Sequence, residues 1–398
     1  MHFLGFGSHP YPALPFGTAR VWDMGVTWKD VAPSPSSSYV GEGSPGLRRL
    51  DAIIARFRQH HVQPVVTLGM TPAWAARSCK HVVNGVDWGS QTCAPRDISS
   101  SGPWGRYVRG LAQRYRSSVR YFELWNEPSL HNGWNDSVTA LAQMQQVAAQ
   151  VLHAAGHGQK LIAPSIPFTD GGPAHGLSWL NDFLGRPGGT DFDVAGFHLY
   201  PTDDSARAGA GPEWSMDVAL PAVKAVLDKH GVADRPIWNT ETNVGRVPAG
   251  VTFSGLTGAG MVARTFILGT EAGVRRIIWY AADDRSWGGT WLENANLTSL
   301  TTAGSGYLVV RDQLLGKVPL GCSRQPSEAN GERYTCKFGT AAGAVTLLAL
   351  WTTGRPFATP APAATSAWYT LDGARHAAFR GRALTVGKAP IFVLGSVG

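Results

Sequence analysis

The chain has 398 residues, 43% of them hydrophobic and 16% charged, with a formal net charge of +7. This composition is typical of a folded globular protein and excludes a disordered chain, and no apolar run reaches the roughly 20 residues that a membrane-spanning helix needs. Lys and Arg are scattered rather than gathered with aromatic residues, which argues against a nucleic-acid groove. The 15 Trp and 10 Tyr residues are a heavy aromatic load, most of it expected in the core and some of it available to stack on sugars.

Strand-like segments alternate with segments of helical periodicity along the first three quarters of the chain. The predicted strands are residues 3–7, 19–23, 64–69, 121–128, 160–163, 192–198, 235–243 and 275–280. The predicted helices are residues 47–60, 104–115, 138–155, 177–184, 218–230 and 258–272. Eight strands with helices between most of them predict an α/β fold, a (β/α)8 TIM barrel, in which functional side chains gather at the C-terminal ends of the strands.

From about residue 307 the helical periodicity fades, and short β-rich runs follow between Gly and Pro turns. We therefore expect a catalytic barrel over residues 1–306 and a C-terminal β-sandwich accessory domain over residues 307–398. No aromatic-rich face stands out in the second region, which favours a structural role over a sugar-binding module. Within the barrel, the loops at residues 71–103 and 201–212 are expected to decide between a pocket and a groove.

Two of the predicted strands end in a glutamate. In the stretch 121–128 an apolar, aromatic run ends in Asn126-Glu127-Pro128, and Pro128 cannot continue a strand. In the stretch 235–243 a second short apolar run ends at Glu241. A pair of carboxyl groups at one face of a barrel is what cleavage of a glycosidic bond requires. The alternative is that both residues are surface or ion-pair glutamates.

A family resemblance rests on these residues and on one further motif. The motifs are Phe122-Glu123-Leu124-Trp125-Asn126-Glu127-Pro128, Glu241 at the end of the seventh strand, and His198-Leu199-Tyr200-Pro201 after the sixth. In these features the chain resembles the retaining glycoside hydrolases of clan A, which are TIM barrels, and most closely family 39. The resemblance implies that Glu127 is the acid/base and Glu241 the nucleophile, with carboxyl groups about 5–5.5 Å apart. It also implies that Asn126 donates to the 2-hydroxyl of the sugar.

Other side chains are candidates for substrate binding: Asn126, His198, Tyr200, Trp279, His9, Trp22 and Arg20. His198 and Tyr200 resemble subsite residues of the family, with Tyr200 a candidate donor to Glu241. A hydrogen-bonded core residue is the alternative for His198. Glu123 lies in the middle of its strand, where a buried ion pair with an arginine such as Arg20 is favoured over catalysis.

Three more strand ends contribute to this prediction. Trp279 ends the eighth strand and is expected to form the floor under the bound sugar rather than to lie in the core. His9 follows the first strand, where it contacts sugar or only shapes its loop. Arg20, Trp22 and Asp23 end the second strand, where they could meet hydroxyl groups or orient the nucleophile.

The four cysteines fall into two local pairs, Cys79 with Cys93 and Cys322 with Cys336. This spacing favours two disulfides and an oxidising compartment over free thiols, and zinc would want closer CxxC spacing. No signal peptide precedes the first strand, so we expect a secreted, periplasmic or cell-surface protein whose targeting segment has been removed or was never there. Nothing in the sequence demands a metal or a cofactor.

Together these features predict a secreted, retaining glycoside hydrolase whose partner is a polysaccharide or oligosaccharide. Two alternatives stay open. One is a barrel that binds carbohydrate without turnover, and the other is a transglycosylase, in which a sugar rather than water accepts the glycosyl group. The sugar, its linkage and the choice between exo and endo action depend on loops, which carry no motif.

Overall fold

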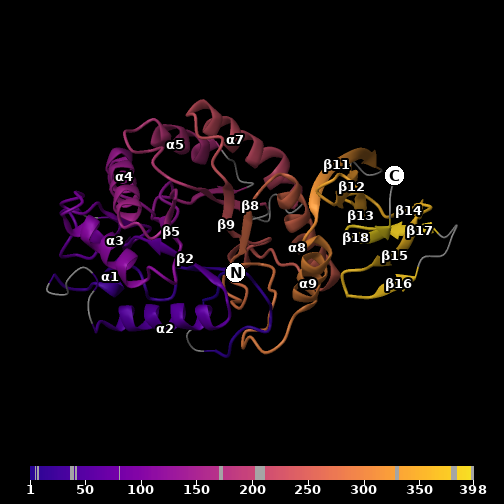
Figure 1. The fold of residues 1–398 in the computed structure, drawn as a ribbon, viewed down its shortest axis with the longest axis horizontal. Helices are drawn as coiled ribbons and strands as arrows, with labels where there is room; N and C mark the ends of the chain where they lie inside the picture. Colours follow the sequence, from indigo (N-terminus) through magenta and orange to yellow (C-terminus); the bar gives the residue numbers. More distant parts are fainter. Residues whose placement is uncertain are drawn as a thin grey trace.

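Two parallel sheets form the wall of a barrel (Figure 1). The computed structural model describes residues 1–4, 6, 9–35, 40, 43–79, 81–169, 174–201, 211–327, 331–377 and 383–395. In one sheet the order is β1 (Thr18–Val21), β2 (Gln63–Leu68), β5 (Tyr121–Leu124) and β6 (Lys160–Ile162). In the other it is β10 (Arg276–Trp279), β9 (Ile237–Thr242), β8 (Ala195–Tyr200) and β7 (Ile166–Thr169).

The N-terminus closes one seam between these sheets. The amide of His2 donates to the carbonyl of Trp279 (2.8 Å), and the amide of Arg20 donates to the carbonyl of Met1 (2.9 Å). The extended residues 1–3 therefore lie between β10 and β1 and take the position of the first barrel strand.

The prediction for this first strand, residues 3–7, is wrong, because it lies too far along the chain. Leu4 already lies in a bend, while Gly5 and Gly7 lie outside the described residues. Phe6 is buried because its ring stacks on Phe57 of the helix outside the barrel (4.4 Å), not because it continues the sheet.

At the other seam, β6 and β7 are two parts of one interrupted strand. Ser165 between them is bridged to Asn126 just beyond β5, and Ile162 is bridged to Val194 just before β8. Eight strand positions thus surround the core, which confirms the predicted TIM barrel.

Helices cover the outside of the barrel (Figure 1). Their bounds are α1 (Trp28–Val31), α2 (Pro45–Gln59), α3 (Pro103–Arg114), α4 (Val138–Ala154), α5 (Ala174–Leu184), α6 (Pro212–Trp214), α7 (Leu220–Lys229), α8 (Gly255–Glu271) and α9 (Thr302–Leu314). The side chains of Ser44 and Ser137 accept backbone N–H groups and so cap α2 and α4. Helix α2 turns an apolar stripe that includes Leu50, Ile53 and Phe57 to the barrel.

Two antiparallel sheets follow α9 and confirm the predicted β-sandwich. The larger has the order β11-β12-β13-β18-β15-β16, and the smaller pairs β14 with β17. Their bounds are β11 (Val318–Ser327), β12 (Gly331–Gly339), β13 (Val345–Thr352), β14 (Phe357–Pro360), β15 (Thr365–Tyr369), β16 (Arg375–Ala377), β17 (Ala383–Val386) and β18 (Ile391–Gly395). The core of these sheets is apolar and consists of Leu348, Leu350, Leu384, Val386, Ile391 and Val393.

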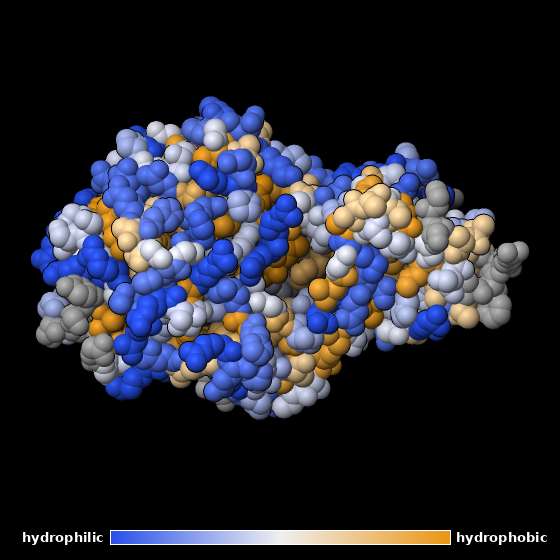
Figure 2. Space-filling model, viewed as in Figure 1, coloured by the Kyte–Doolittle hydropathy of each residue, from blue (hydrophilic) through white to orange (hydrophobic). Residues whose placement is uncertain are grey.

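The larger sheet also packs on the barrel. Trp351 of β13 is fully buried, and its Nε1 donates to Glu213 of α6 (3.0 Å), which pairs with Arg264 of α8 (3.1 Å). In the face shown in Figure 2, hydrophilic residues cover most of the barrel and hydrophobic residues are more frequent toward this junction. Helix α9 packs on α8 and crosses the expected boundary at residue 306, so the division into residues 1–306 and 307–398 stays a prediction.

Among the described residues, no helix combines the length and the apolar character that crossing a bilayer requires.

Candidate active site

Glu127 follows β5 at a sharp turn of the backbone. Trp125 and Glu127 have positive φ angles of 55° and 45°, a left-handed conformation that costs a residue other than glycine about 1–3 kcal/mol. The turn is held by the Glu127 amide, which donates to the carbonyl of Ser165 (3.0 Å), and by Trp125 Nε1, which donates to the carbonyl of Gly133 (2.9 Å). A Cβ at Gly133 would lie 2.0 Å from the Glu127 carbonyl oxygen, so this close approach requires glycine.

Glu241 lies in β9, where the strand carries a bulge. Phe197 of β8 pairs with Asn239, but the next residue, His198, pairs with Glu241, so Thr240 is an extra residue in β9. A bulge changes the direction in which the following side chains point and is frequent beside active sites. Glu241 lines the pocket described next while keeping only 6% of its surface exposed.

The two glutamates share one pocket of about 510 Å³ at the C-terminal ends of the strands. One carboxylate oxygen of Glu127 lies within 4.8 Å of one of Glu241. The Glu127 side chain is 20% exposed, so it is the more accessible of the pair. The rest of the lining comes from Asp23, Asn126, Leu130, Asn132, Pro167, Thr169, Tyr200, Gly245, Arg246, Tyr280, Trp287 and Gly288.

Arg20 of β1 ties three strand ends together beneath this pocket. Its side chain is fully buried, and Nε donates to Glu123 (2.6 Å), Nη1 to Glu241 (2.6 Å) and Nη2 to the Asn126 Oδ1 (2.7 Å). Burial, the largest single influence, acts to raise the pKa of Glu123, but the charge of Arg20, together with His198 and hydrogen bonds from Ser165 and Thr240, holds this pKa below its usual value. The ion pair with Glu123 is the one that the sequence suggested, and the planar guanidinium fork fits all three partners.

Tyr200 of β8 gives Glu241 a second donor. Its hydroxyl donates to Glu241 Oε1 at 2.5 Å, while Arg20 occupies Oε2. Burial raises the pKa of Glu241 above its usual value, and the charge of Arg20 and the Tyr200 hydrogen bond oppose that rise. Because donors hold both oxygens, the carboxylate is fixed in orientation and supported as an anion despite its burial.

His198 is the partner of Glu127. Its Nδ1 lies 2.8 Å from Glu127 Oε1, and the imidazole is fully buried. Burial, with a further contribution from the charge of Arg20, lowers the pKa of His198 to about 4. The imidazole is therefore neutral near pH 7 and adds no positive charge beside Glu127.

His2 and Tyr280 belong to the site although the sequence did not single them out. The His2 side chain is fully buried, with Nδ1 3.7 Å from Glu241 and Nε2 3.8 Å from Asp23. The Tyr280 hydroxyl donates to Asp23 (3.3 Å), and its ring meets His2 edge to face at 4.8 Å. Burial lowers the pKa of His2 to about 3 and raises that of Asp23. His2 belongs to no motif of the sequence, so no sequence signal marks it.

Both tryptophans that were expected at the site lie in the interior. Trp279 is fully buried and its Nε1 donates to the carbonyl of Thr290 (3.0 Å), whereas the next residue, Tyr280, lines the pocket. Trp22 is 4% exposed, whereas Asp23, which was named with it at the end of the second strand, lines the pocket. Successive residues of an extended chain point to opposite faces, so in each case the neighbour faces the ligand.

His9 also lies outside the lining of this pocket. Its carbonyl accepts a hydrogen bond from Arg56 of α2 (2.9 Å), so the structure supports a role in the loop and not a sugar contact. Most of the loop at residues 201–212, which was expected to shape the site, lies outside the described residues, since these do not include 202–210.

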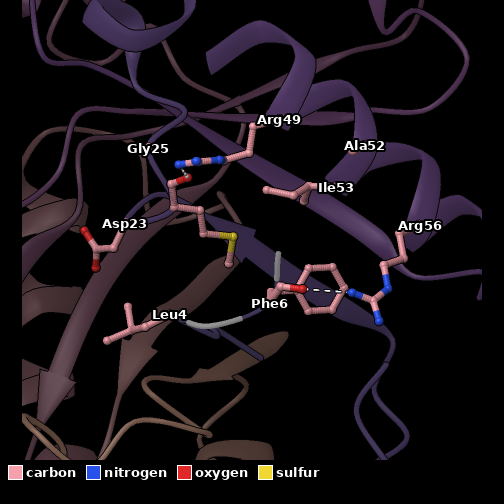
Figure 3. Close-up of a pocket in the computed structure, with 9 residues that line it drawn as sticks. Leu4, Phe6, Asp23, Gly25, Arg49, Ala52, Ile53 and Arg56 are labelled. Atoms are coloured by element: carbon pink, nitrogen blue, oxygen red, sulfur yellow. Dashed lines mark hydrogen bonds between the residues drawn. The ribbon is translucent and has the colours of Figure 1, made fainter. Parts of the chain in front are cut away.

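A second pocket of about 450 Å³ adjoins the first, between α2 and the segments that follow the first two strands (Figure 3). Asp23 lines both pockets. Arg49 and Arg56 of α2 donate to the carbonyls of Met24 (3.2 Å) and Phe6 (2.8 Å), which braces these segments. Asp23 is the only acid among the described residues of this lining, so the paired carboxyl groups mark the first pocket as the reactive one.

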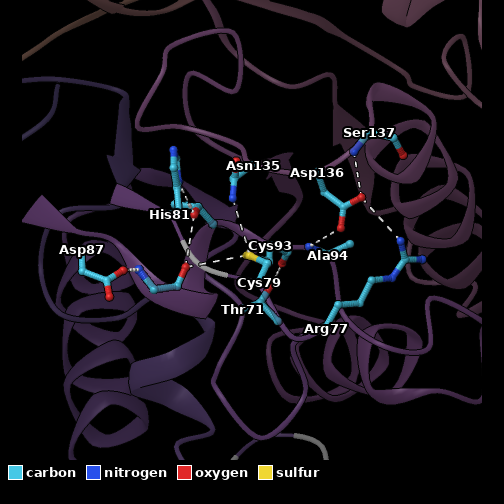
Figure 4. Close-up of a disulfide and its surroundings, with 12 residues drawn as sticks. Thr71, Arg77, Cys79, His81, Asp87, Cys93, Ala94, Asn135, Asp136 and Ser137 are labelled. Carbon is cyan, nitrogen blue, oxygen red and sulfur yellow. Dashed lines mark hydrogen bonds and ion pairs between the residues drawn. A yellow bond between two sulfur atoms is a disulfide. The ribbon is translucent and has the colours of Figure 1, made fainter. Parts of the chain in front are cut away.

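The predicted disulfide between Cys79 and Cys93 is present, and its loop supports the site indirectly (Figure 4). This loop contains the short strands β3 (Val82–Val83) and β4 (Val86–Asp87). Asp136 anchors it by accepting from the Ala94 amide (3.3 Å) and pairing with Arg77 (3.4 Å). None of the described residues of this loop lines the pocket, where Leu130 and Asn132 belong to the segment that the loop braces. The expectation that residues 71–103 help to decide between a pocket and a groove stays a prediction.

The second predicted disulfide is also present. Cys322 and Cys336 join the paired strands β11 and β12. This bond lies in the C-terminal sheets and does not contribute to the pocket.

Glu127, His198 and Glu241 are the three described side chains that could together approach a metal ion. Their facing atoms are already engaged, since His198 bonds to Glu127 and Tyr200 donates to Glu241. The positive charge of Arg20 beside Glu241 would also repel a cation. The arrangement therefore fits a carboxylate pair better than a metal site.

Comparisons with known proteins agree with this geometry. The sequence matches a family model described as "Glycosyl hydrolase catalytic core" over residues 100–307, a little more than half of the chain. A stretch of 217 residues is 26% identical to the probable mannan endo-1,4-beta-mannosidase F of Aspergillus flavus and 25% identical to that of Aspergillus oryzae. It covers 49% of this chain and 45% of each relative, so the chain spans about half the length of the curated relatives it matches.

Solved structures share the fold at low sequence identity. A glucosidase from Croceicoccus marinus has a TM-score of 0.60 at 13% identity, with 96% of this chain and 90% of that chain covered. A GH30 endoxylanase from Clostridium papyrosolvens has a TM-score of 0.58 at 12% identity, with 96% of this chain and 89% of that chain covered. A GH39 enzyme from Xanthomonas axonopodis pv. citri has a TM-score of 0.56 at 14% identity, with 96% of this chain and 88% of that chain covered. With the match over its central barrel, the chain belongs to the glycosyl hydrolase family defined by that catalytic core.

Proposed function

We propose that the protein hydrolyses glycosidic bonds with retention of configuration, through a covalent glycosyl-enzyme intermediate. The observation that carries this proposal is the approach of a Glu127 oxygen to within 4.8 Å of a Glu241 oxygen in one pocket. Retaining enzymes hold their two carboxyl groups about 5 Å apart, whereas inverting enzymes need about 6.5–9.5 Å to admit a water molecule.

The surroundings of the two carboxyl groups support different roles. Arg20 and Tyr200 donate to Glu241, and a nucleophile must be an oriented carboxylate. Glu127 is more exposed, and its partner His198 is neutral, so this histidine adds no positive charge that would favour the ionised form. Glu127 is therefore the group suited to hold a proton for the leaving group.

In the first step Glu241 attacks the anomeric carbon, the glycosidic bond breaks, and the proton of Glu127 passes to the departing oxygen. In the second step Glu127 takes a proton from water, whose oxygen displaces Glu241 from the same carbon. Asn126 accepts from Arg20 through Oδ1, so its amide NH₂ is the group left to donate to the sugar 2-hydroxyl.

The substrate that we propose is a polysaccharide or oligosaccharide. Two relatives are named as mannanases and one structural neighbour as a xylanase, so β-1,4-linked mannan and xylan are the first polymers to test. Two disulfides support a secreted or cell-surface location.

The test is a hydrolysis screen on aryl glycosides and polysaccharides with three variants. We expect Glu241→Gln to lose activity by about 10⁴-fold or more, because the covalent step has no nucleophile. Glu127→Ala should keep turnover of aryl glycosides with good leaving groups and should form a glycosyl azide of retained configuration when azide is added. Asp234→Asn, on an exposed side chain far from the pocket, serves as the matched control.

Three outcomes would change the assignment. Activity that survives in Glu241→Gln would refute the nucleophile. A wild type that binds sugars but cleaves none would indicate a binding barrel. Longer products at high acceptor concentration would indicate a transglycosylase.

A further inference from the structure

Trp287 is an exposed aromatic residue on the rim of the catalytic pocket. It follows β10, lines the same pocket as Glu127 and Glu241, and is 44% exposed. In the described part of the chain it is the only tryptophan among the large apolar side chains that are exposed. Leaving so large an apolar ring in water is unfavourable, so an exposed tryptophan beside a reactive pair indicates a binding surface.

Backbone hydrogen bonds hold the segment that carries Trp287 in place. The amide of Val247 donates to the carbonyl of Trp287 (2.8 Å), and the amide of Gly289 donates to the carbonyl of Gly245 (3.0 Å). These bonds join the segment after β9 to the segment after β10, so the rim is built before any ligand arrives. A preformed aromatic surface loses little conformational entropy on binding.

The neighbouring side chains fix the orientation of the ring. The Arg246 guanidinium lies 4.8 Å from the centroid of the Trp287 ring and covers part of it. Gly288 allows the close approach, because a Cβ there would lie 2.3 Å from the Asn243 side-chain nitrogen. Arg246 and Trp287 both line the pocket, so the part of the indole that Arg246 leaves uncovered adjoins the pocket.

The rest of the lining favours a carbohydrate over a protein partner. Asp23, Asn132 and Thr169 line the same pocket and offer hydrogen bonds to hydroxyl groups. A sugar ring has an apolar face of C–H groups that packs flat on an aromatic ring, while its hydroxyl groups point outward to such partners.

We propose that Trp287 is a stacking platform for a sugar unit next to the one held between Glu127 and Glu241. This inference rests on the proposed function and extends it, because a platform beside the cleaved bond serves a chain of sugars and not a single glycoside. The substrate class is therefore an oligosaccharide or polysaccharide that occupies at least two adjacent positions of the pocket.

The experiment compares substrates of two lengths. For wild type and Trp287→Ala we would measure kcat/KM on 4-nitrophenyl β-mannoside and β-xyloside, and on β-1,4-mannohexaose and xylohexaose. Loss of the platform should lower kcat/KM on the cleaved hexaose by about 10–100-fold, and this loss should exceed the loss on the monoglycoside by at least about tenfold. Trp287→Phe keeps a ring and should recover most of the loss.

The matched control is Trp368→Ala. Trp368 lies in β15 and stacks on His376 at 3.8 Å, in the C-terminal sheets and away from the pocket, so it should change neither kcat/KM value. Melting temperatures of all variants identify any that are poorly folded. The proposal would be overturned if Trp287→Ala lowered kcat/KM equally on both substrate lengths, or lowered it on neither.

Binding separates this inference from the proposed function. If the wild type cleaves none of these substrates, the hydrolase proposal fails. The affinity for the hexaoses, measured by calorimetry, then tests the role of Trp287 by itself. Affinity that falls at least about tenfold in Trp287→Ala would support it. Unchanged affinity, or a wild type that binds none of the hexaoses, would overturn it.

Discussion

The ends of the barrel strands and the C-terminal sheets bury opposite kinds of side chain. Beneath the pocket, Arg20, Glu123 and Glu241 are all nearly or fully buried. In the sandwich, the corresponding interior is formed by residues such as Leu348 and Val393. Removing charges from water costs free energy that pairing only partly offsets, whereas burying apolar surface stabilises the fold. The C-terminal ends of the barrel strands are therefore organised for chemistry, whereas the C-terminal sheets contribute stability.

The most severe test of this comparison is Arg20→Met. Methionine is apolar and of similar length, but it leaves Glu123 buried without its counter-charge, which should lower the free energy of unfolding by about 3–5 kcal/mol. Glu241 and Asn126 lose their common anchor, so kcat/KM should fall by at least about 10³-fold. Chemical denaturation and kinetics on the best substrate measure the two effects.

Arg20→Lys is the matched control for charge. An ammonium group cannot donate to Glu123, Glu241 and Asn126 in the geometry of the guanidinium fork. We expect stability to recover in part while activity stays low. Full activity in Arg20→Lys would show that charge alone, and not the three-way geometry, serves the site.

The second test is made in the apolar region. Leu348 is 5% exposed in the core between the two C-terminal sheets. Leu348→Ala should destabilise the protein by about 2–4 kcal/mol through lost burial and a cavity. Activity per folded molecule should stay at the wild-type value, because no charged partner of the pocket changes. A fall in kcat/KM at temperatures where the variant is folded would break the comparison.

The third test removes one hydrogen bond from the buried carboxylate. Tyr200→Phe deletes the donor to Glu241 Oε1 and should lower kcat/KM by about 10–100-fold, the value of a hydrogen bond to a charged group. That bond opposes the rise of the Glu241 pKa caused by burial, so its loss raises this pKa further. Since Glu241 acts as a carboxylate, the acidic limb of the pH profile of kcat/KM should move to higher pH. A limb that moves to lower pH would contradict the assigned role.

Local sequence patterns were sufficient to predict that Glu127 and Glu241 lie at strand ends, and to predict seven of the eight barrel strands. Asn126-Glu127-Pro128 ends an apolar run with a residue that cannot extend a strand, and this strand end can be recognised without knowledge of the fold. Once both strands are assigned to a barrel, Glu127 and Glu241 must lie at the same face.

The partners of these glutamates were predicted only in part, Tyr200 as a donor to Glu241 from the family resemblance and Arg20 from its place at the end of a strand. Arg20 is 103 residues from Glu123 and 221 residues from Glu241, so no local pattern links them. His2 reaches the site because the N-terminus closes a seam of the barrel, which is a property of the assembled sheet. Trp279 was expected under the sugar and not in the core, and this is wrong because the sequence marks the end of a strand only to within a residue or two, and one residue reverses the face.

The smallest effect is expected from Glu293, a second fully buried glutamate of the barrel region. Its Oε1 accepts from the amide of Leu14 (2.8 Å), but it forms no ion pair within the described part of the chain, in contrast to Glu123. Burial therefore raises the pKa of Glu293 from 4.5 to about 7. The folded protein then binds more protons than the unfolded chain between these pH values, so stability falls as pH rises from about 4.5 to about 7.

Glu293→Gln isolates this contribution. The amide oxygen of glutamine can still accept from Leu14, and it carries no charge at any pH. Melting temperatures measured between pH 5 and pH 8 should fall less in Glu293→Gln than in the wild type, and at pH 8 the variant should be the more stable by an amount on the order of 1–3 kcal/mol. If the melting temperatures of variant and wild type change in parallel across this range, Glu293 stays ionised in the folded protein. Burying a carboxylate without a counter-charge would then cost less free energy in this barrel than the pairing of Glu123 with Arg20 suggests.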